Sequence, residues 1–240
     1  MGSWEAQISA VAALDEPTRR RLYDYVVRQP EPVSRDEAAA AFELPRTTAA
    51  FHLDRLVDED LLDVVYQRRT GRTGPGAGRP SKLYRRSDYH VAVSLPQRRY
   101  DLAGRLLCSA LEHAERSGES PRALLDQCAY QMGKEIGKQE RDTAGNHATR
   151  DTAVQVLEVY GFEPRVEGDD IIFANCPFHT LAQEYAGLVC GMNLSLLNGL
   201  LDGLIPTGLT AHLQPAPRRC CIRLSPGVIG SERELAGRCP

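Results

Sequence analysis

Apolar side chains in residues 1–60 recur at the three- and four-residue spacing of short amphipathic helices. Ser34 with Glu37 has the spacing of a capping box, and Pro17 suits the first turn of a helix. Two of the helices are separated only by the short turn at residues 43–45, which is a helix-turn-helix pattern. The predicted helices span Trp4–Asp15, Thr18–Arg28, Arg35–Phe42 and Arg46–Asp60.

The pattern becomes extended after residue 60. Leu61–Gln67 is rich in β-branched and aromatic residues, and Lys82–Arg86 returns to an extended pattern. Between them, Arg68–Pro80 is rich in glycine, arginine and proline, which are residues of turns and loops. We therefore expect a β-hairpin with a long basic tip. Three helices followed by such a hairpin have the layout of a winged helix.

The remaining chain predicts helices first and then a mixed module. Apolar stripes run along residues 102–114 and 122–138, and such stripes after a DNA-binding module favour dimerisation. Strand patterns joined by the Gly168-Asp169 turn follow, then a helix at Met192–Leu204 and two closing strands. We expect an α+β fold with a winged helix-turn-helix domain at 1–92, a helical linker and dimerisation segment at 93–140, an α+β cysteine-containing sensor domain at 150–226 and a mobile tail at 227–240.

Composition narrows the function classes. The chain has 240 residues, 42% of them hydrophobic and 25% charged, which is ordinary for a soluble globular protein. No run of eighteen apolar residues predicts a membrane span, and the N-terminus lacks the layout of a signal peptide. We therefore expect a cytoplasmic protein with no membrane partner. Because phosphate-loop, dinucleotide-binding and nucleophile-elbow motifs are absent, we expect no enzymatic activity.

Charge points to nucleic acid. The net charge is −3, yet Val64–Ser87 contains seven basic residues and no acidic one. A local basic cluster attracts polyanions. A helix that reads the major groove needs short polar and basic side chains in its N-terminal half, and a wing supplies cations to phosphates. We expect a double-stranded DNA operator bound by a homodimer, through Arg46, Thr47, Thr48, His52 and Arg55 of the helix and Arg68, Arg69, Arg79 and Lys82 of the hairpin.

The chain also carries seven cysteines, an odd number that argues against a full disulfide framework in a cytosolic protein. Cys176, Cys190 and the pair Cys220 and Cys221 fall at a strand end, a helix start and a strand start, where thiolates can converge. Soft thiolates suit iron–sulfur clusters, Zn²⁺ or Cu⁺. His179 could add a nitrogen ligand. A helix N-terminus near Cys190 predicts a lowered thiol pKa there. Buried inert thiols and a dithiol switch at the vicinal pair remain alternatives.

Two stretches resemble a known family. Leu44–Leu56, the following Leu61-Leu62 and Gly78–Tyr84 resemble the ArsR-like winged-helix regulators. Cys176-Pro177-Phe178-His179, with Cys190 and Cys220 downstream, is similar to the group within them that contains the iron–sulfur repressor of the Suf cluster-assembly operon. The stretch Gly191–Leu204 departs from that group, whose members are more acidic there.

The resemblance implies a DNA-binding transcriptional regulator that senses redox state, nitric oxide or iron–sulfur status. It implies a [4Fe–4S] cluster held by Cys176, Cys190 and Cys220, with Cys221 as an alternative to Cys220. The fourth ligand is not evident from the sequence; His179 is the first candidate, followed by Glu184 or solvent. A structural or sensory Zn²⁺ site, or a small-molecule pocket, remains the alternative function for the C-terminal domain.

Overall fold

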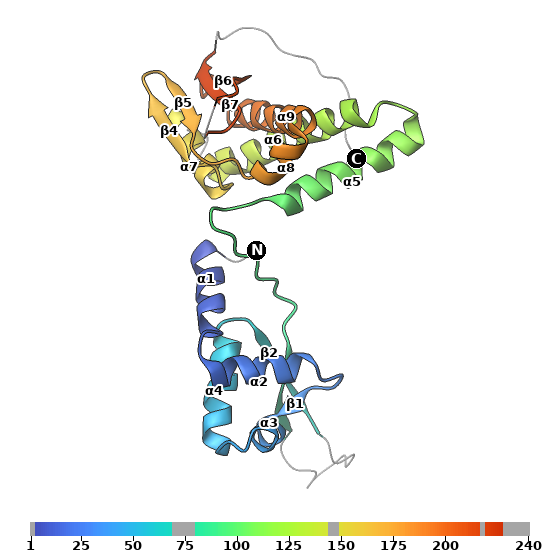
Figure 1. The fold of residues 1–240 in the computed structure, drawn as a ribbon, viewed down its shortest axis with the longest axis vertical. Helices are drawn as coiled ribbons and strands as arrows, with labels where there is room; N and C mark the ends of the chain where they lie inside the picture. The colour runs from blue at the N-terminus through green and yellow to red at the C-terminus, as the bar shows by residue number, and fades with distance from the viewer. Residues whose placement is uncertain (1–2, 69–79, 144–148, 217–218, 228–240) are drawn as a thin grey trace. The chain divides into compact units, whose positions relative to one another are not determined.

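The chain divides into two compact units, residues 1–93 and 94–240 (Figure 1). The computed structural model describes residues 3–68, 80–143, 149–216 and 219–227. Each unit has its own hydrophobic core. The predicted fold class is confirmed: helices and a β-hairpin wing come first, then central helices, then an antiparallel sheet. Apart from Gly227, the predicted tail lies outside the described residues.

Local sequence signals explain the ends of the N-terminal helices. The Glu16 carboxylate accepts hydrogen bonds from the Thr18 and Arg19 amides, at 3.0 and 2.6 Å, and caps the helix that Pro17 opens. The predicted capping box of Ser34 and Glu37 is present. The first unit consists of α1 (Trp4–Ala13), α2 (Pro17–Val27), β1 (Val33–Ser34), α3 (Arg35–Ala41), α4 (Arg46–Asp58), β2 (Leu62–Gln67) and β3 (Ser81–Arg86).

The three strands of this unit pair antiparallel in the order β1-β3-β2. Helix α4 buries Ala49, Leu53 and Leu56, and the two leucines belong to a core shared with α2 and with Tyr84 of β3. Because these residues face the core, their burial sets which side of α4 points inward. The opposite side of α4 therefore faces solvent.

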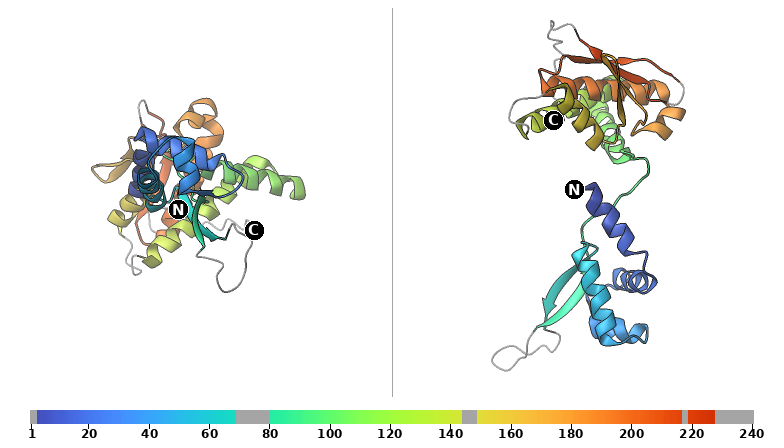
Figure 2. Two further views of the ribbon diagram at one scale, coloured as in Figure 1. Left: turned by 90° about the horizontal axis from the view of Figure 1, so that it is seen from below. Right: turned by 90° about the vertical axis from the view of Figure 1, so that its left-hand side faces the viewer.

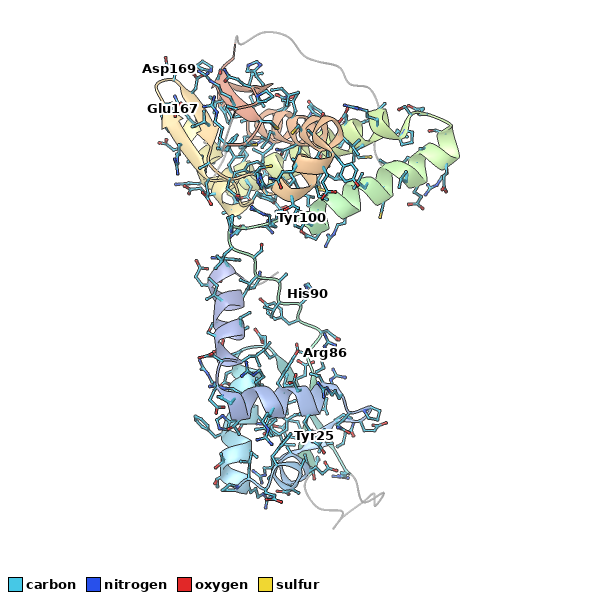
Figure 3. The ribbon with its side chains drawn as sticks, in the orientation of Figure 1. Tyr25, Arg86, His90, Tyr100, Glu167 and Asp169 are labelled. Carbon is cyan, nitrogen blue, oxygen red and sulfur yellow. The ribbon has the colours of Figure 1, made fainter. Side chains whose placement is uncertain are left out.

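The second unit places helices beside a four-stranded antiparallel sheet of order β4-β5-β7-β6 (Figure 2). Glu167 and Asp169 lie at the tip of the β4–β5 hairpin, where Gly168 takes a positive φ (Figure 3). Helix α9 begins six residues earlier than the predicted Met192. The elements are α5 (Tyr100–Ser117), α6 (Pro121–Thr143), α7 (Arg150–Val159), β4 (Pro164–Glu167), β5 (Asp170–Phe173), α8 (His179–Glu184), α9 (Ala186–Leu204), β6 (Leu209–Leu213) and β7 (Ile222–Pro226).

Helices α6 and α9 approach each other at backbone distance because glycines line their contact. Gly133 and Gly137 of α6 face the backbone of α9, and Gly199 and Gly203 of α9 face the backbone of α6. A methyl group at any of the four would collide with a carbonyl oxygen of the opposing helix. Among the described residues α9 is the one helix whose length and composition would suit a membrane span, yet 56% of that segment is buried inside this fold. It is the core helix of the second unit.

Candidate nucleic-acid interface and cysteine site

Helix α4 presents a polar and basic face to solvent. Arg46, Thr47 and Arg55 are exposed, and Thr48 is half-buried. The same face carries Phe51, whose side chain is 67% exposed. Because Thr47, Phe51 and Arg55 are spaced by four residues, they form one stripe along the helix. Four of the five predicted DNA contacts of α4 are therefore accessible to a ligand, and the aromatic ring of Phe51 lies beside them.

Both arginines of α4 have acidic partners in the free protein. Arg46 Nε lies 2.5 Å from Asp36 Oδ1, and Arg55 Nη2 lies 2.5 Å from Glu59 Oε1. The arginine side chains are 59% and 48% exposed. Ion pairs this exposed contribute little free energy. A phosphate or a guanine edge can therefore replace the carboxylate.

His52 occupies a different position from the other predicted contacts. Its side chain is only 13% exposed, and Nδ1 lies 3.4 Å from Glu16 Oε2 at the start of α2. The imidazole therefore faces the N-terminus of α2. Its role in DNA binding stays a prediction.

The hairpin is tied to α4 through one carboxylate. Asp54 Oδ1 accepts hydrogen bonds from Lys82 Nζ at 2.6 Å and from the Tyr84 hydroxyl at 2.7 Å. Partial burial raises the pKa of Asp54, but these hydrogen bonds outweigh it, so the net pKa is lowered. Lys82 is thus ion-paired in the free protein. Arg68 is exposed at the end of β2, while the predicted contacts Arg69 and Arg79 lie outside the described residues.

Four cysteines of the second unit meet through their side chains. The Cys220 thiol is within hydrogen-bonding reach of the sulfurs of Cys176 and Cys221, and Cys221 is within reach of Cys190. Cys176 and Cys220 are buried, and Cys190 and Cys221 are half-buried. The structure therefore brings both members of the vicinal pair into the same group as Cys176 and Cys190.

The surroundings of these thiols lower the pKa of some of them and raise the pKa of others. A hydrogen bond from Cys220 lowers the pKa of Cys176, and the same kind of bond lowers the pKa of Cys221 to about 6. Burial, with Cys221 beside it, raises the pKa of Cys190 to about 12. The prediction of a lowered pKa at Cys190 is therefore wrong. The helix begins at Ala186, so Cys190 lies past the first turn, where the dipole has faded and burial dominates.

A buried amide supports this group. Asn193 is 1% exposed, and its Nδ2 donates to Cys220 Sγ at 3.8 Å. Arg98 Nη1 donates to Asn175 Oδ1 at 2.6 Å and to the Cys176 carbonyl at 3.3 Å. The Phe178 amide also donates to Cys176 and lowers its pKa further. Hydrogen bonds of this kind favour the anionic form of a thiol.

A cavity of about 270 Å³ opens beside Cys176. Arg98, His179 and Arg219 line it, and no carboxylate does so among the residues the structure describes. His179 is exposed. Across the described ranges, no three histidine, cysteine, aspartate or glutamate side chains surround one point as the ligands of a single ion. Among the four thiols, Cys220 pairs with Cys176 and Cys221, and Cys221 pairs with Cys190.

Comparison with known proteins bears on the first unit. Residues 14–65 match the family described as a helix-turn-helix domain. The chain therefore carries a helix-turn-helix domain of the ArsR-like kind, and the protein is a DNA-binding transcriptional regulator. No curated protein and no solved structure matches the chain.

Sequence reasoning missed three residues of these sites. Phe51 reads as a core position by hydrophobicity, and only the register of α4 shows that it faces solvent. Asp54 lies on the expected recognition helix, but its partners come from β3, 28 and 30 residues away. Asn193 interrupts an apolar helix; a lone amide in such a run is a weak signal of a buried partner, and the partner is Cys220.

Proposed function

We propose that this regulator controls DNA binding through a [4Fe–4S] cluster held by Cys176, Cys190 and Cys220. The signal is redox state, nitric oxide or iron–sulfur supply. The observation that carries the proposal is the meeting of these three thiols in one partly buried group, although they span 44 residues of the chain. The regulator acts in the cytoplasm.

The donor set fits such a cluster by its chemistry. Thiolates are the usual ligands of iron–sulfur clusters, and each binds a different iron atom. A tetrahedral zinc ion instead needs its ligands around a single point. No three histidine, cysteine, aspartate or glutamate side chains are placed to hold a metal ion among the described residues, so the case for a cluster over zinc rests on the number of soft thiols in this group. Cys221, which is in contact with Cys220 and Cys190, is an alternative to Cys220, and His179 in the adjoining cavity is the candidate fourth ligand.

The charges near the thiols fit the same group. A cluster held by thiolates is anionic, and Arg98, His179 and Arg219 line the cavity beside Cys176. Arg98 is held by neutral amide and carbonyl oxygens, so its charge stays available to offset that of the thiolates. Asn193 would stabilise the Cys220 thiolate through its N–H group. These are the contacts around metal ligands that tune a bound cluster.

The cluster supplies a group that oxidants and nitric oxide can alter or remove. Its loss changes DNA binding only if the cluster has different affinities for the DNA-binding and the free conformations of the protein. We further propose a homodimer, because two helix-turn-helix units read paired half-sites about 34 Å apart. Helix α5 supports this with an amphipathic sequence whose outer side leaves Leu111 54% exposed.

Anaerobic purification or reconstitution, with an absorption spectrum and iron, sulfide and zinc analysis of one sample, tests the proposal. We expect a brown protein with a broad band near ~400 nm and about four irons per chain. Cys176→Ser should lose the cluster, whereas the matched variant Cys108→Ser, at an exposed cysteine, should keep it. Stoichiometric zinc without colour would support the zinc alternative. A protein that stays colourless and metal-free after reconstitution would refute both and leave a small-molecule regulator.

A further inference from the structure

The side chain of Phe51 is exposed at the centre of the DNA-reading helix. It is 67% exposed and lies between Thr47 and Arg55 on the stripe described above. Its ring packs edge-on against His52, with centroids 5.3 Å apart and planes at 69°. Because His52 is itself nearly buried against α2, the ring of Phe51 has a fixed support. The helix thus presents an apolar surface at the position where it meets the operator.

The surroundings of Phe51 fit DNA rather than another apolar surface. Thr47 and Arg55 share its face of α4, Arg46 is exposed at the start of the same helix, and Arg68 is exposed on the adjoining hairpin. Arg46 and Arg55 are paired with Asp36 and Glu59 in the free protein, but these exposed pairs are weak, so the arginines and the Thr47 hydroxyl can bind a phosphate-lined groove instead. A contact between two protein copies through this face would bring arginines from both copies together. The partner that best fits this face of α4 is therefore DNA, bound through its major groove.

One base offers an apolar group in that groove. Thymine carries a methyl group at C5, and phenylalanine is among the side chains that contact it. We propose that Phe51 reads the 5-methyl group of a thymine in each operator half-site, which makes it a specificity-determining residue. This inference depends on the helix-turn-helix domain alone. It stands or falls independently of the cluster.

Replacement of thymine by uracil isolates the methyl group, because pairing and all hydrogen-bonding groups stay the same. The full-length protein first selects duplexes from a random-sequence library. Its affinity for the selected duplex is then measured with deoxyuridine at each thymidine position in turn. We expect deoxyuridine at one position in each half-site to weaken binding about fourfold. This is the contribution of one buried methylene-sized group to affinity. Phe51→Ala should bind the thymidine duplex more weakly and show no penalty at that position.

Three controls make the result specific. Tyr66→Ala removes an equally exposed aromatic side chain of β2, 65% exposed, and should keep the uracil penalty. Thr47→Ser removes the one methyl group on the Thr47, Phe51 and Arg55 stripe, and this variant should also keep the penalty. Phe51→Leu keeps an apolar side chain and should retain part of the uracil penalty. Circular dichroism and a thermal melt check that each variant is folded.

Five outcomes would overturn the proposal. The selected sites contain no invariant T·A pair, or uracil has no effect on the wild type. The penalty persists unchanged in Phe51→Ala, or it disappears in Thr47→Ser instead. A change of oligomeric state in Phe51→Ala with unchanged DNA affinity would assign the ring to a protein interface, which also contradicts the proposal.

Discussion

At the residue scale, Asp54 links the DNA-reading helix to the wing. Its carboxylate accepts hydrogen bonds from Lys82 and Tyr84 of β3, and Tyr84 is a core residue. Asp54 therefore adds a polar link to the apolar packing that holds the helix against the hairpin. Solvent screening limits its contribution to about 1 kcal/mol.

Asp54→Asn keeps the acceptor oxygen and removes the charge, so it isolates the electrostatic part. The net pKa of Asp54 is lowered in the folded state, so its charge stabilises the fold above its ordinary value of 3.8 and this is lost as pH falls below it. We expect wild type to be more stable than Asp54→Asn by about 1 kcal/mol at pH 7. The difference should shrink as the pH falls below 3.8 and disappear once Asp54 is protonated in the folded protein. Urea melts at a series of decreasing pH values measure it, and a difference that does not shrink with falling pH would contradict the assignment.

Arg46 is the first residue of the DNA-reading helix and the strongest candidate for a base contact. If its guanidinium forms the paired hydrogen bonds to a guanine, Arg46→Ala should cost about 1–3 kcal/mol in binding to a selected operator. Arg46→Lys keeps the charge and loses the planar fork, so it should recover binding to random DNA but not specificity. Fluorescence anisotropy at one salt concentration compares the variants. An equal loss on specific and random DNA would show that Arg46 contacts phosphate only.

The grouping of the cysteines could be predicted from the sequence, but the properties of the individual thiols could not. Their positions at the ends of elements suggested that Cys176, Cys190 and Cys220 meet, and the structure brings them into one group. The pKa of Cys190 could not be predicted, because it depends on burial and on Cys221, which only tertiary packing determines. The exposure of Phe51 and the burial of Asn193 are likewise properties of the packed helices.

At the element scale, strong local signals made the helix-turn-helix elements predictable. Pro17, the capping box of Ser34 and the Pro45 turn place the starts of α2, α3 and α4 within one residue of the predictions. The start of α9 was predicted six residues late, because its first two turns have neither a cap nor a regular polar face. Its glycines were a weak signal as well, since their role depends on contact with α6.

The glycine contact between α6 and α9 predicts an unusual pair of substitutions. Gly199→Ala should destabilise the protein by about 1–3 kcal/mol, because the new methyl group meets the Tyr130 carbonyl and the helices cannot approach. Gly104→Ala, in α5 with open space around it, should stabilise by about 0.5–1 kcal/mol through helix propensity. Chemical denaturation of both variants tests the pair. Small and equal changes in the stability of both variants would contradict the prediction, because they would mean that α6 and α9 can move apart at little cost.

At the scale of the whole molecule, a homodimer would present two DNA-reading helices to a paired operator. Light scattering should give about 53 kDa, twice the chain mass of 26.5 kDa. Leu111→Glu, on the exposed side of α5, should yield monomers and weaken operator binding, whereas Leu213→Glu, equally accessible on β6, should not. A monomeric wild type at micromolar concentration, or a dimer that survives Leu111→Glu, would exclude this use of α5.

The central claim is that the cysteine group of the second unit controls DNA binding by the first. The most direct measurement compares the affinity of one anaerobic sample for its selected duplex before and after the cluster is removed by oxidation and chelation. Cys176→Ser treated in the same way serves as the control. Coupling between two sites is commonly 5- to 150-fold in affinity, and the account predicts a change of at least about fivefold in wild type and none in the control. A cluster-bearing protein whose operator affinity is the same with and without its cluster would contradict the account.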